Sequence, residues 1–465
     1  MSNTGFSHIP KKVKKIKTDY RTICTSLPVP ESIPILERVY QTESHSMHGQ
    51  LPIIWDKAEG FQVFDSWGNK WIDFSSTIFV ANSGHSNQRI INALEKLIKK
   101  PLLQTYTYTS PERHDYLDYL INNTPSYFEK AFLLSAGTEA TEATLKLMRL
   151  NGIKEGKKKG GILCFEGNWH GRTLGAQMMG YSSQQKEWIG YLDPNIYHLP
   201  FPYPWVKEAI SDPRAFFRKS IQELCEKERI DPKNDLCGIM METFQGWGAV
   251  FYPNEFVQEI SLFAKENNLL LTFDEMQAGF GRTGELFGYM NYNVIPDLIA
   301  CGKGSSSSLP LSIVLGSKKV MDLPEIGSMS STHSANPMVC AAGKANLEAL
   351  LEDGLIENSK KLGVLFHEQL NILKIKFSDY ISHVNGTGLL AALIFNNSDN
   401  NPLSNLCDLI SEKCLHKGLL VVHTGRESIK LAPPLVINHE ALFEGLNVLE
   451  ESIEESINEL YGKVT

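Results

Sequence analysis

Short, uninterrupted apolar runs alternate with helical stretches through the middle of the chain, and this alternation limits the possible folds more than any other feature. Continuous apolar runs are typical of strands that are covered on both faces, as in parallel sheets. The runs are Ala131–Ser135, Gly161–Phe165, Cys237–Thr243, Leu269–Asp274, Leu298–Cys301 and Ser312–Leu315. Helical periodicity fits Glu139–Leu150, Phe256–Asn267 and Val339–Leu351. The pattern predicts an α/β domain with a mainly parallel sheet.

The length of 465 residues permits one large and one smaller domain. Residues 1–60 are rich in Pro, Ser and Lys, and we expect an N-terminal arm that forms part of the smaller domain. Residues 61–338 are predicted to form the large domain. Beyond about residue 340 the sequence predicts a long helix, three strand candidates and a final helix, hence a small α+β domain over 339–465. The strand candidates are Gly388–Phe395, Gly418–His423 and Ser428–Leu431.

Charge and cysteine usage exclude several classes of protein. The net charge of −8 gives no reason to expect nucleic acid, and the basic run over residues 11–17 is interpreted as a solvated arm rather than a polyanion site. Eight scattered cysteines form no C-x-x-C pair, so we expect reduced thiols, no metal site and a cytoplasmic protein. No stretch approaches about 18 apolar residues, so no membrane association is expected.

Acid and base groups follow three of the predicted strands directly. Asp274 ends one strand, Glu242 closes another, and Lys303 follows a third. Ligands of open α/β sheets gather beyond the carboxyl ends of the strands, so these groups should converge. Pyridoxal 5′-phosphate (PLP) requires a lysine for a Schiff base and an acid that keeps its ring nitrogen protonated. Lys303 and Asp274 match these two roles, and a released Lys303 would act as the base at the substrate Cα.

Two glycine-containing segments are candidates for phosphate binding. Ser135–Glu139 lies between a strand and a helix, where the amides of Gly137 and Thr138 and the Thr138 hydroxyl would hold a phosphate, although an ordinary helix cap gives the same pattern. Gly279–Gly284 fits G-x-G-x-x-G, but its glycines do not open an amphipathic helix. We therefore do not expect a dinucleotide site there.

Together these pieces resemble the class III (ω-amino acid type) aminotransferases, which are PLP enzymes of fold type I. The resemblance runs from about Gly60 to Leu446, and its most specific part is residues 273–284, followed by Pro296-Asp297-Leu298 and Gly302-Lys303-Gly304. Further matching motifs are residues 65–74, Gly84-His85, residues 167–173 and residues 332–337. The resemblance implies a large domain with a mainly parallel seven-stranded sheet and a smaller α+β domain.

The resemblance also implies roles for individual residues. Lys303 matches the Schiff-base lysine and Asp274 the partner of the ring nitrogen, with Glu242 counted among the cofactor-binding residues. The remaining cofactor matches are Gln277 near the 3′-oxygen, Trp169 on the ring face, Gly137 and Thr138 at the phosphate, and Thr332 reaching the phosphate from a neighbouring subunit. That last match implies a homodimer with shared active sites. His85 and His170 are interpreted as structural.

The substrate-binding half departs from the family pattern. Many relatives that use glutamate carry a Glu after Gln-Gly, paired with an Arg before Ala-Pro-Pro; here Trp247 and Lys430 stand in those places. Lys430 can attract a carboxylate, but only as a point charge. Arg172 matches a position that binds a substrate carboxylate in some branches, with a structural salt bridge as the alternative. Ser305–Ser308 replace a glycine-rich run, and we expect them to fill the loop rather than to bind substrate.

The sequence therefore predicts a PLP-dependent transaminase, a transferase of nitrogenous groups. It would move an amino group from a donor amino acid to a keto acid or aldehyde by a ping-pong route through the pyridoxamine form. Racemisation, epimerisation or decarboxylation on the same fold is the main alternative. A non-catalytic binding protein is disfavoured, because Lys303, Asp274 and Gln277 are all present.

Overall fold

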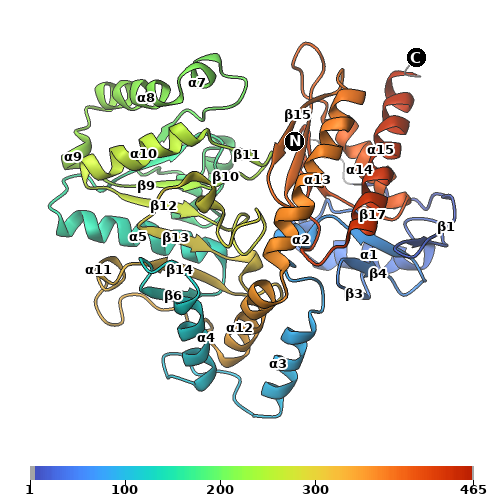
Figure 1. The fold of residues 1–465 in the computed structure, drawn as a ribbon, viewed down its shortest axis with the longest axis horizontal. Helices are drawn as coiled ribbons and strands as arrows, with labels where there is room; N and C mark the ends of the chain where they lie inside the picture. Colours follow the sequence, from blue (N-terminus) through green and yellow to red (C-terminus); the bar gives the residue numbers. More distant parts are fainter. Residues whose placement is uncertain (1–5, 463–465) are drawn as a thin grey trace. The chain divides into compact units, whose positions relative to one another are not determined.

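The computed structural model describes residues 6–462 and separates into two compact units (Figure 1). The first unit contains the chain up to Asn87, the short segment Trp247–Ala249, and the chain from Glu357 onward. The second unit contains Gln88–Gly246 and Val250–Ile356. Within the described residues, no helix combines the length and the apolarity needed to cross a bilayer.

A seven-stranded sheet forms the centre of the second unit, with strand order β6-β14-β13-β12-β9-β7-β8. Only β14 runs antiparallel to its neighbours; the pairs between β13, β12, β9, β7 and β8 are parallel. The strands are β6 (Lys130–Leu134), β7 (Gly161–Phe165), β8 (Ile196–Leu199), β9 (Leu236–Glu242), β12 (Leu270–Asp274), β13 (Leu298–Cys301) and β14 (Ser312–Gly316). The expected α/β fold with a mainly parallel sheet is confirmed.

Helices cover this sheet, and α5 (Gly137–Lys154) packs directly on it. Its residues Ala140, Leu147 and Met148 belong to one core cluster with strand residues such as Ile162 and Met240. The other helices of the unit are α3 (Gln88–Ile98), α4 (Pro111–Asn122), α6 (Leu174–Met179), α7 (Lys207–Ser211), α8 (Pro213–Glu228), α9 (Pro232–Asp235), α10 (Asn254–Asn267), α11 (Lys318–Met321) and α12 (Pro337–Glu352). A short hairpin joins β10 (Phe244–Gln245) to β11 (Val250–Phe251).

The boundaries of the compact units differ from the positions 60 and 338 expected from the sequence. Helix α12 belongs to the second unit, because it packs on α3 and α4. Ala342 and Ala345 of α12 form a buried cluster with Ile90 of α3. Arg89 adds ion pairs to the end of α12 and the residue after it, at 2.8 Å to Glu352 and 2.6 Å to Asp353. The division therefore falls after α12, at residue 356.

The first unit combines the N-terminal segment with the C-terminal part of the chain. One sheet contains β1 (Ile16–Lys17), β2 (Thr22–Ile23), β3 (Lys57–Glu59), β4 (Gln62–Phe64), β5 (Lys70–Asp73) and β17 (Leu419–Leu420). A second sheet has the order β15 (Ile381–Gly386), β16 (Ala391–Phe395), β19 (Ser428–Leu431), β18 (Val422–His423). Its main helices are α1 (Ile33–Thr42), α13 (Leu355–Lys376), α14 (Ser404–His416) and α15 (His439–Tyr461). The N-terminal arm thus has more regular structure than its composition indicated.

Four consecutive residues of this unit, Ser76–Phe79, have positive φ angles between 47° and 68°. Such a left-handed turn costs roughly 1–2 kcal/mol per residue for L-amino acids. It is held in place by Asp73, whose Oδ1 accepts hydrogen bonds from the Ser75 amide at 2.7 Å and from its hydroxyl at 2.5 Å. The other oxygen of Asp73 pairs with His85 Nε2 at 2.7 Å. His85 therefore supports a strained turn, in line with its structural interpretation.

Candidate active site

Three acid or base groups lie at the carboxyl ends of adjacent parallel strands in the second unit. Asp274 ends β12, Glu242 ends β9, and the two residues are register partners. Asp274 is also the register partner of Ala300 on β13, and Lys303 follows the end of that strand at Cys301. The fold thus gathers at one sheet edge the three residues that the sequence singled out.

Asp274 is held in a fixed orientation by its neighbours. His170 Nδ1 lies 2.9 Å from Asp274 Oδ2, and the Met276 amide donates to Asp274 Oδ1 at 3.0 Å. Both side chains are buried. The other ring nitrogen of His170, Nε2, is buried and has no hydrogen-bond partner among residues 6–462. His170, which the sequence left as structural, is therefore the group that positions the candidate catalytic carboxylate.

Lys303 has an unusual backbone conformation and an altered ionisation. Its φ angle is 42°, in the left-handed region, where a side chain with a Cβ is strained. Burial lowers the pKa of the Lys303 ammonium below its ordinary value, while the negative charges of Asp274 and Glu242 act in the opposite direction. A larger fraction of the side chain is therefore the free amine near neutral pH, which is the form that attacks a carbonyl carbon.

The serine run after Lys303 fills its own loop. Ser305 Oγ donates to the Leu311 carbonyl at 2.7 Å, Ser306 Oγ donates to the Leu309 carbonyl, and Ser308 Oγ donates to the Ser306 carbonyl at 3.0 Å. The side-chain amide of Asn346 holds the same loop by donating to the carbonyls of Gly304 and Ser305. These bonds fit the expectation that the serines replace glycines structurally.

The first turn of α5 has the features of an anion site. Gly137 begins the helix, and a Cβ at this position would lie 2.6 Å from Met276 Sδ. Gly171 allows a loop to approach Thr138, since its Cβ would lie 2.3 Å from Thr138 Oγ1. The Thr138 hydroxyl lies 2.6 Å from that of Thr173. The amides at the start of a helix lack partners within the helix and favour a phosphate.

Glu242, Trp169 and Gln277 form a connected group beside these residues. The Trp169 amide donates to Glu242 Oε2 at 2.9 Å. Gly246 permits close packing, because a Cβ there would lie 2.1 Å from Gln277 Nε2 and 3.0 Å from Glu242 Oε1. Trp169 is 37% exposed, and an aromatic side chain of this kind can stack on a flat ring. The residues present therefore fit both the phosphate and the ring of PLP.

The candidate substrate residues are distributed over both units. In the second unit the exposed Arg172 stacks on Trp169, with its guanidinium carbon 4.6 Å from the ring centroid. No ion pair of Arg172 is found within the described range 6–462. In the first unit Lys430 is buried on β19 with its Nζ 4.2 Å from the Phe79 ring centroid. Trp247 also belongs to the first unit.

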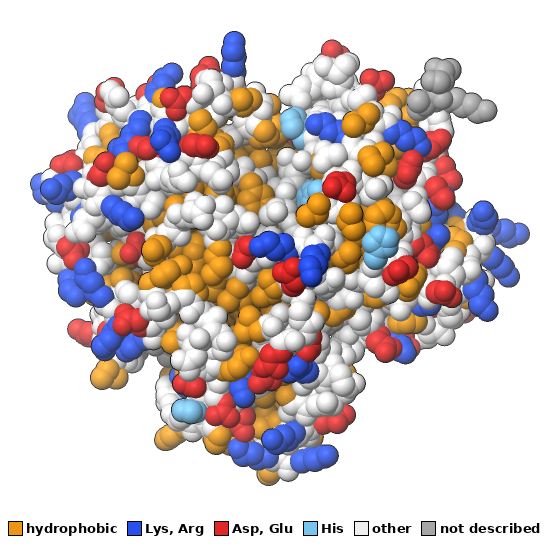
Figure 2. Space-filling model, in the orientation of Figure 1, with side chains coloured by type: hydrophobic (Ala, Val, Ile, Leu, Met, Phe, Trp, Pro, Cys, Tyr) orange, Lys and Arg blue, Asp and Glu red, His pale blue; other side chains and the backbone are white. Residues whose placement is uncertain are grey.

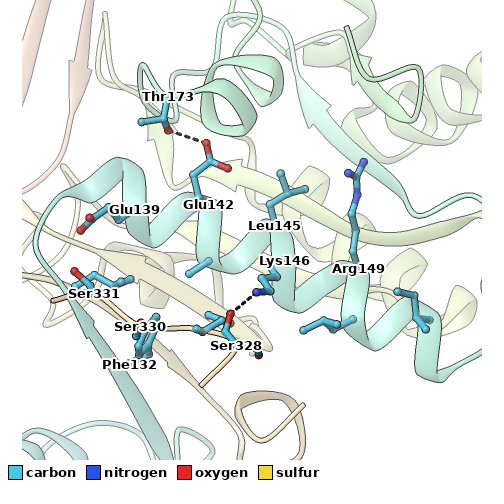
Figure 3. A pocket seen from close by; sticks show the side chains of 15 residues that line it. Phe132, Glu139, Glu142, Leu145, Lys146, Arg149, Thr173, Ser328, Ser330 and Ser331 are labelled. Carbon is cyan, nitrogen blue, oxygen red and sulfur yellow. Dashed lines mark hydrogen bonds between the residues drawn. The ribbon is translucent and has the colours of Figure 1, made fainter. Parts of the chain in front are cut away.

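Two surface grooves flank the first turn of α5. One has a volume of about 600 Å³ and runs along α5 beside Ser328–Ser331 (Figure 3). Lys146 crosses it to donate to the Ser328 carbonyl at 2.6 Å, and Glu142 binds Thr173. The other groove, of about 620 Å³, is lined by Ser135, Glu139 and Thr332 among others. Figure 2 shows apolar side chains gathered over this part of the second unit, around α5 and β14.

The Gly279–Gly284 segment forms a closed turn rather than the start of a helix. The amide of Phe280 donates to the Leu286 carbonyl at 2.6 Å, and that of Gly284 donates to the Gly281 carbonyl at 3.1 Å. Glu275, just before the segment, is fully buried and accepts hydrogen bonds from the amides of Gly288 and Tyr289. Burial raises its pKa to about 7. This geometry agrees with the rejection of a dinucleotide site.

The sequence matches the family described as Aminotransferase class-III over residues 43–453. The chain therefore belongs to the class III aminotransferases, which are PLP-dependent transaminases. It is 33% identical to an ornithine aminotransferase of Saccharomyces cerevisiae, covering 88% of this chain and 95% of that protein. It is 28% identical to an alanine/serine racemase of Pyrococcus horikoshii, covering 99% and 97%. The fold matches the ornithine aminotransferase of Toxoplasma gondii with a TM-score of 0.80 at 22% identity, over 93% and 97% of the two chains.

Proposed function

We propose that this transaminase moves an amino group from an amino acid donor to a keto acid or aldehyde by a ping-pong route, with Lys303 and Asp274 as its catalytic residues. The observation that carries the proposal is the convergence of Asp274, Glu242 and Lys303 at three adjacent strand ends. The lowered pKa of Lys303 and the fixed orientation of Asp274 support these roles.

Each proposed residue has a distinct task. When bound, PLP supplies an electron sink that stabilises negative charge at the substrate Cα. Asp274 holds the proton on the ring nitrogen, and His170 keeps the Asp274 carboxylate in place. Lys303 would hold the cofactor covalently through its amine and, as a free amine, would move the proton at the substrate Cα. Gly137 and Thr138 would hold the phosphate, Trp169 would stack on the ring, and Gln277 and Glu242 would complete the surroundings of the ring.

We further propose that Arg172, Trp247 and Lys430 contact the substrate. Arg172 offers a planar fork on an exposed side chain, which suits a carboxylate. Lys430 supplies a buried positive charge, and Trp247 offers a flat apolar wall. We expect a substrate that combines a carboxylate with an apolar or extended portion.

A half-reaction experiment tests the type of chemistry. Purified protein loaded with PLP is mixed with single amino donors in the absence of any acceptor, and the absorption of the bound cofactor is followed. We expect one equivalent of donor to convert the cofactor fully to its amino form and to release one equivalent of keto acid or aldehyde.

Turnover without this conversion would contradict transamination. Interconversion of the two enantiomers of alanine or serine would favour the racemase alternative, which the similarity to the Pyrococcus horikoshii protein makes worth including. Release of carbon dioxide would favour a decarboxylase. A protein that binds no PLP would contradict the whole assignment.

We also propose that the protein is a homodimer whose active sites are shared. The two grooves beside α5 include Ser330 and Ser331, and the second also includes Thr332. Nearby side chains are apolar and strongly exposed: Leu103 is 62% exposed, Tyr108 is 80% exposed, and Ile326 is fully exposed. The residue after Thr332, His333, contacts the 101–108 segment, because its Nδ1 lies 2.9 Å from Gln104 Nε2. A surface of this kind favours burial against a second copy.

Mixed dimers test whether Thr332 acts in the partner's site. The Thr332→Asp homodimer is expected to bind PLP at least about tenfold more weakly, because a carboxylate would face the phosphate. A hybrid of one Thr332→Asp chain and one Lys303→Ala chain should regain about half of the wild-type activity, since one of its two sites carries neither change. A hybrid with no more activity than expected from the separate variants would contradict shared sites.

A cytoplasmic location is proposed from the state of the cysteines. All eight lie within the described residues, and none forms a disulfide. Only Cys24 and Cys225 reach the surface, and six are buried: Cys164, Cys237, Cys301, Cys340, Cys407 and Cys414. Reduced thiols are typical of cytosolic proteins. The expected partners are two small molecules, an amino donor and a carbonyl acceptor, and in addition a second copy of the chain.

A further inference from the structure

Two hydroxyls and one carboxylate connect the first turn of α5 to the start of α6. The hydroxyl oxygens of Thr138 and Thr173 lie 2.6 Å apart, and the Thr173 hydroxyl donates to Glu142 Oε1 at 2.7 Å. Figure 3 shows Glu142 extending from α5 toward Thr173 on the wall of the first groove. All three side chains belong to the second unit. We call this series of contacts the hydroxyl relay.

The position of each hydrogen in the relay follows from counting donors. An ionised carboxylate only accepts, and each threonine hydroxyl has a single hydrogen to donate. Because Thr173 gives its hydrogen to Glu142, the hydrogen between the two hydroxyls comes from Thr138. Thr138 Oγ1 also accepts from the Thr173 amide at 3.4 Å. The Thr138 hydroxyl therefore has no hydrogen left for a third group in this arrangement.

Backbone contacts hold the relay in place. Glu142 Oε1 also accepts from the amides of Gly175 at 2.8 Å and Ala176 at 3.1 Å, which fixes the carboxylate against the first turn of α6. A Cβ at Gly175 would lie 2.4 Å from Glu142 Oε2, and a Cβ at Gly171 would lie 2.3 Å from Thr138 Oγ1. Glycine at both positions lets this segment approach α5 closely enough for the two hydroxyls to meet.

We propose that Glu142 is a positioning residue that limits how tightly the phosphate of PLP is held, because it competes through Thr173 for the hydroxyl hydrogen of Thr138. The proposal rests on the proposed function, in which Thr138 holds the phosphate. A phosphate dianion offers only acceptors, so Thr138 donates to it only after turning its hydrogen away from Thr173. One hydrogen bond of the relay is then lost, since Thr173 cannot donate to Glu142 and to Thr138 at once.

The charge of Glu142 acts in the same direction as the relay. A carboxylate two hydroxyls away from a phosphate repels it, and this repulsion adds to the competition for hydrogen. A glutamine in this place would reverse both effects, because its amide nitrogen can donate to Thr173, which then donates to Thr138 and leaves the Thr138 hydrogen for the phosphate. Its side-chain oxygen can still accept from the amides of Gly175 and Ala176. The relay thus lowers the affinity for the cofactor and favours cofactor exchange.

Binding of pyridoxamine 5′-phosphate to the full-length chain free of cofactor tests this role. The probe carries the phosphate but no aldehyde, so Lys303 cannot attach it, and pyridoxamine is the matched probe without a phosphate. In calorimetry, Glu142→Gln should lower the Kd of pyridoxamine 5′-phosphate by about 2- to 12-fold, the equivalent of one hydrogen bond. Thr173→Val keeps the charge of Glu142 but breaks the relay, and it should lower the Kd by a similar factor. Neither change should alter the affinity for pyridoxamine.

Two further variants complete the comparison. Glu266→Gln is the charge-matched control: it removes a carboxylate from α10 that forms an exposed ion pair with Arg218 at 2.9 Å, and it should change neither affinity. Thr138→Val should raise the Kd of pyridoxamine 5′-phosphate. In the Thr138→Val background, Thr173→Val should have no further effect, because the two hydroxyls act through one another.

The sign of the change separates the relay from a structural role. If Glu142 only supported α6, its replacement would weaken binding, so a higher Kd in a Glu142→Gln protein with unchanged thermal unfolding would overturn the proposal. An unchanged or higher Kd in Thr173→Val would also overturn it, and tighter binding in Glu142→Gln would then reflect charge alone. If Glu142→Gln does not fold, Thr173→Val decides the question. A wild-type chain that binds no pyridoxamine 5′-phosphate would instead contradict the cofactor assignment, so the two failures are distinguishable.

Discussion

Replacing Lys303 by alanine is expected to lower kcat by about 10⁴-fold or more, because one side chain serves as both nucleophile and base. The variant should still bind PLP through the phosphate and ring contacts, since those groups come from other residues. Borohydride reduction followed by mass measurement separates the two effects. The wild-type chain should gain the mass of the reduced cofactor on the peptide that contains Lys303, and the variant should not.

Lys361→Ala provides a matched control for this experiment. Lys361 is an exposed lysine on α13 that pairs with Glu357 at 3.3 Å. Its loss should leave both turnover and cofactor attachment unchanged. Retained activity in Lys303→Ala, or attachment of the cofactor to another lysine, would remove Lys303 from its proposed role.

Replacing Asp274 by asparagine is expected to lower kcat by about 10²- to 10³-fold, because a neutral amide cannot hold the proton on the cofactor ring through a buried ion pair. The change preserves the size of the side chain and an oxygen for the contact with His170. Asp297→Asn is the control: this carboxyl also accepts an amide hydrogen bond, from Leu271 at 2.8 Å, but it lies at the start of β13 rather than at the end of β12. Equal losses in the two variants would indicate a structural role for Asp274.

Asp274→Asn should also shift the pH dependence of PLP attachment to lower pH. The negative charge of Asp274 raises the pKa of Lys303 and thereby opposes the lowering caused by burial. Without that charge the pKa of Lys303 falls further, so its free amine persists to lower pH. In protein free of cofactor, the rate of PLP attachment should therefore reach its plateau at lower pH in Asp274→Asn than in the wild type. A shift to higher pH would contradict this electrostatic account.

The cofactor half of the site was predictable because its signals are local. Asp274 and Lys303 each follow a short apolar run, and the geometry of parallel strands brings such positions to one edge of a sheet. The contact between His170 and Asp274 was not predictable in this way, because it joins residues 104 positions apart through side-chain packing. The stack of the Arg426 guanidinium on the Trp247 indole, with 4.0 Å between the guanidinium carbon and the ring centroid, also joins residues that are far apart in the sequence.

The compact units differ from the expected organisation for similar reasons. Strands β1 and β2 contain two residues each. A segment this short cannot show the alternation of apolar and polar residues that predicts a strand. The periodicity of α12 indicated a helix correctly, but a helical pattern does not specify which unit its apolar face will join. The contacts of α12 with α3 and α4 place this helix in the second unit. The second unit therefore ends at residue 356 instead of residue 338. Trp247–Ala249 belong to the first unit although the residues on both sides of them belong to the second. A segment of three residues is too short for its sequence to predict this assignment.

The first unit is formed from segments far apart in the sequence, and this affects the order in which the chain can fold during its synthesis. Strand β5 pairs with β17 through Leu419 and Ile72, and Trp71 Nε1 donates to the Leu415 carbonyl at 2.9 Å, across 344 positions. The N-terminal segment emerges from the ribosome first, yet its sheet lacks a strand until the last part of the chain has been synthesised. Contacts of such long range slow folding and prolong the exposure of apolar surface. The second unit consists of a nearly continuous stretch of the chain. It can therefore fold before the strands that pair with the N-terminal segment have been synthesised.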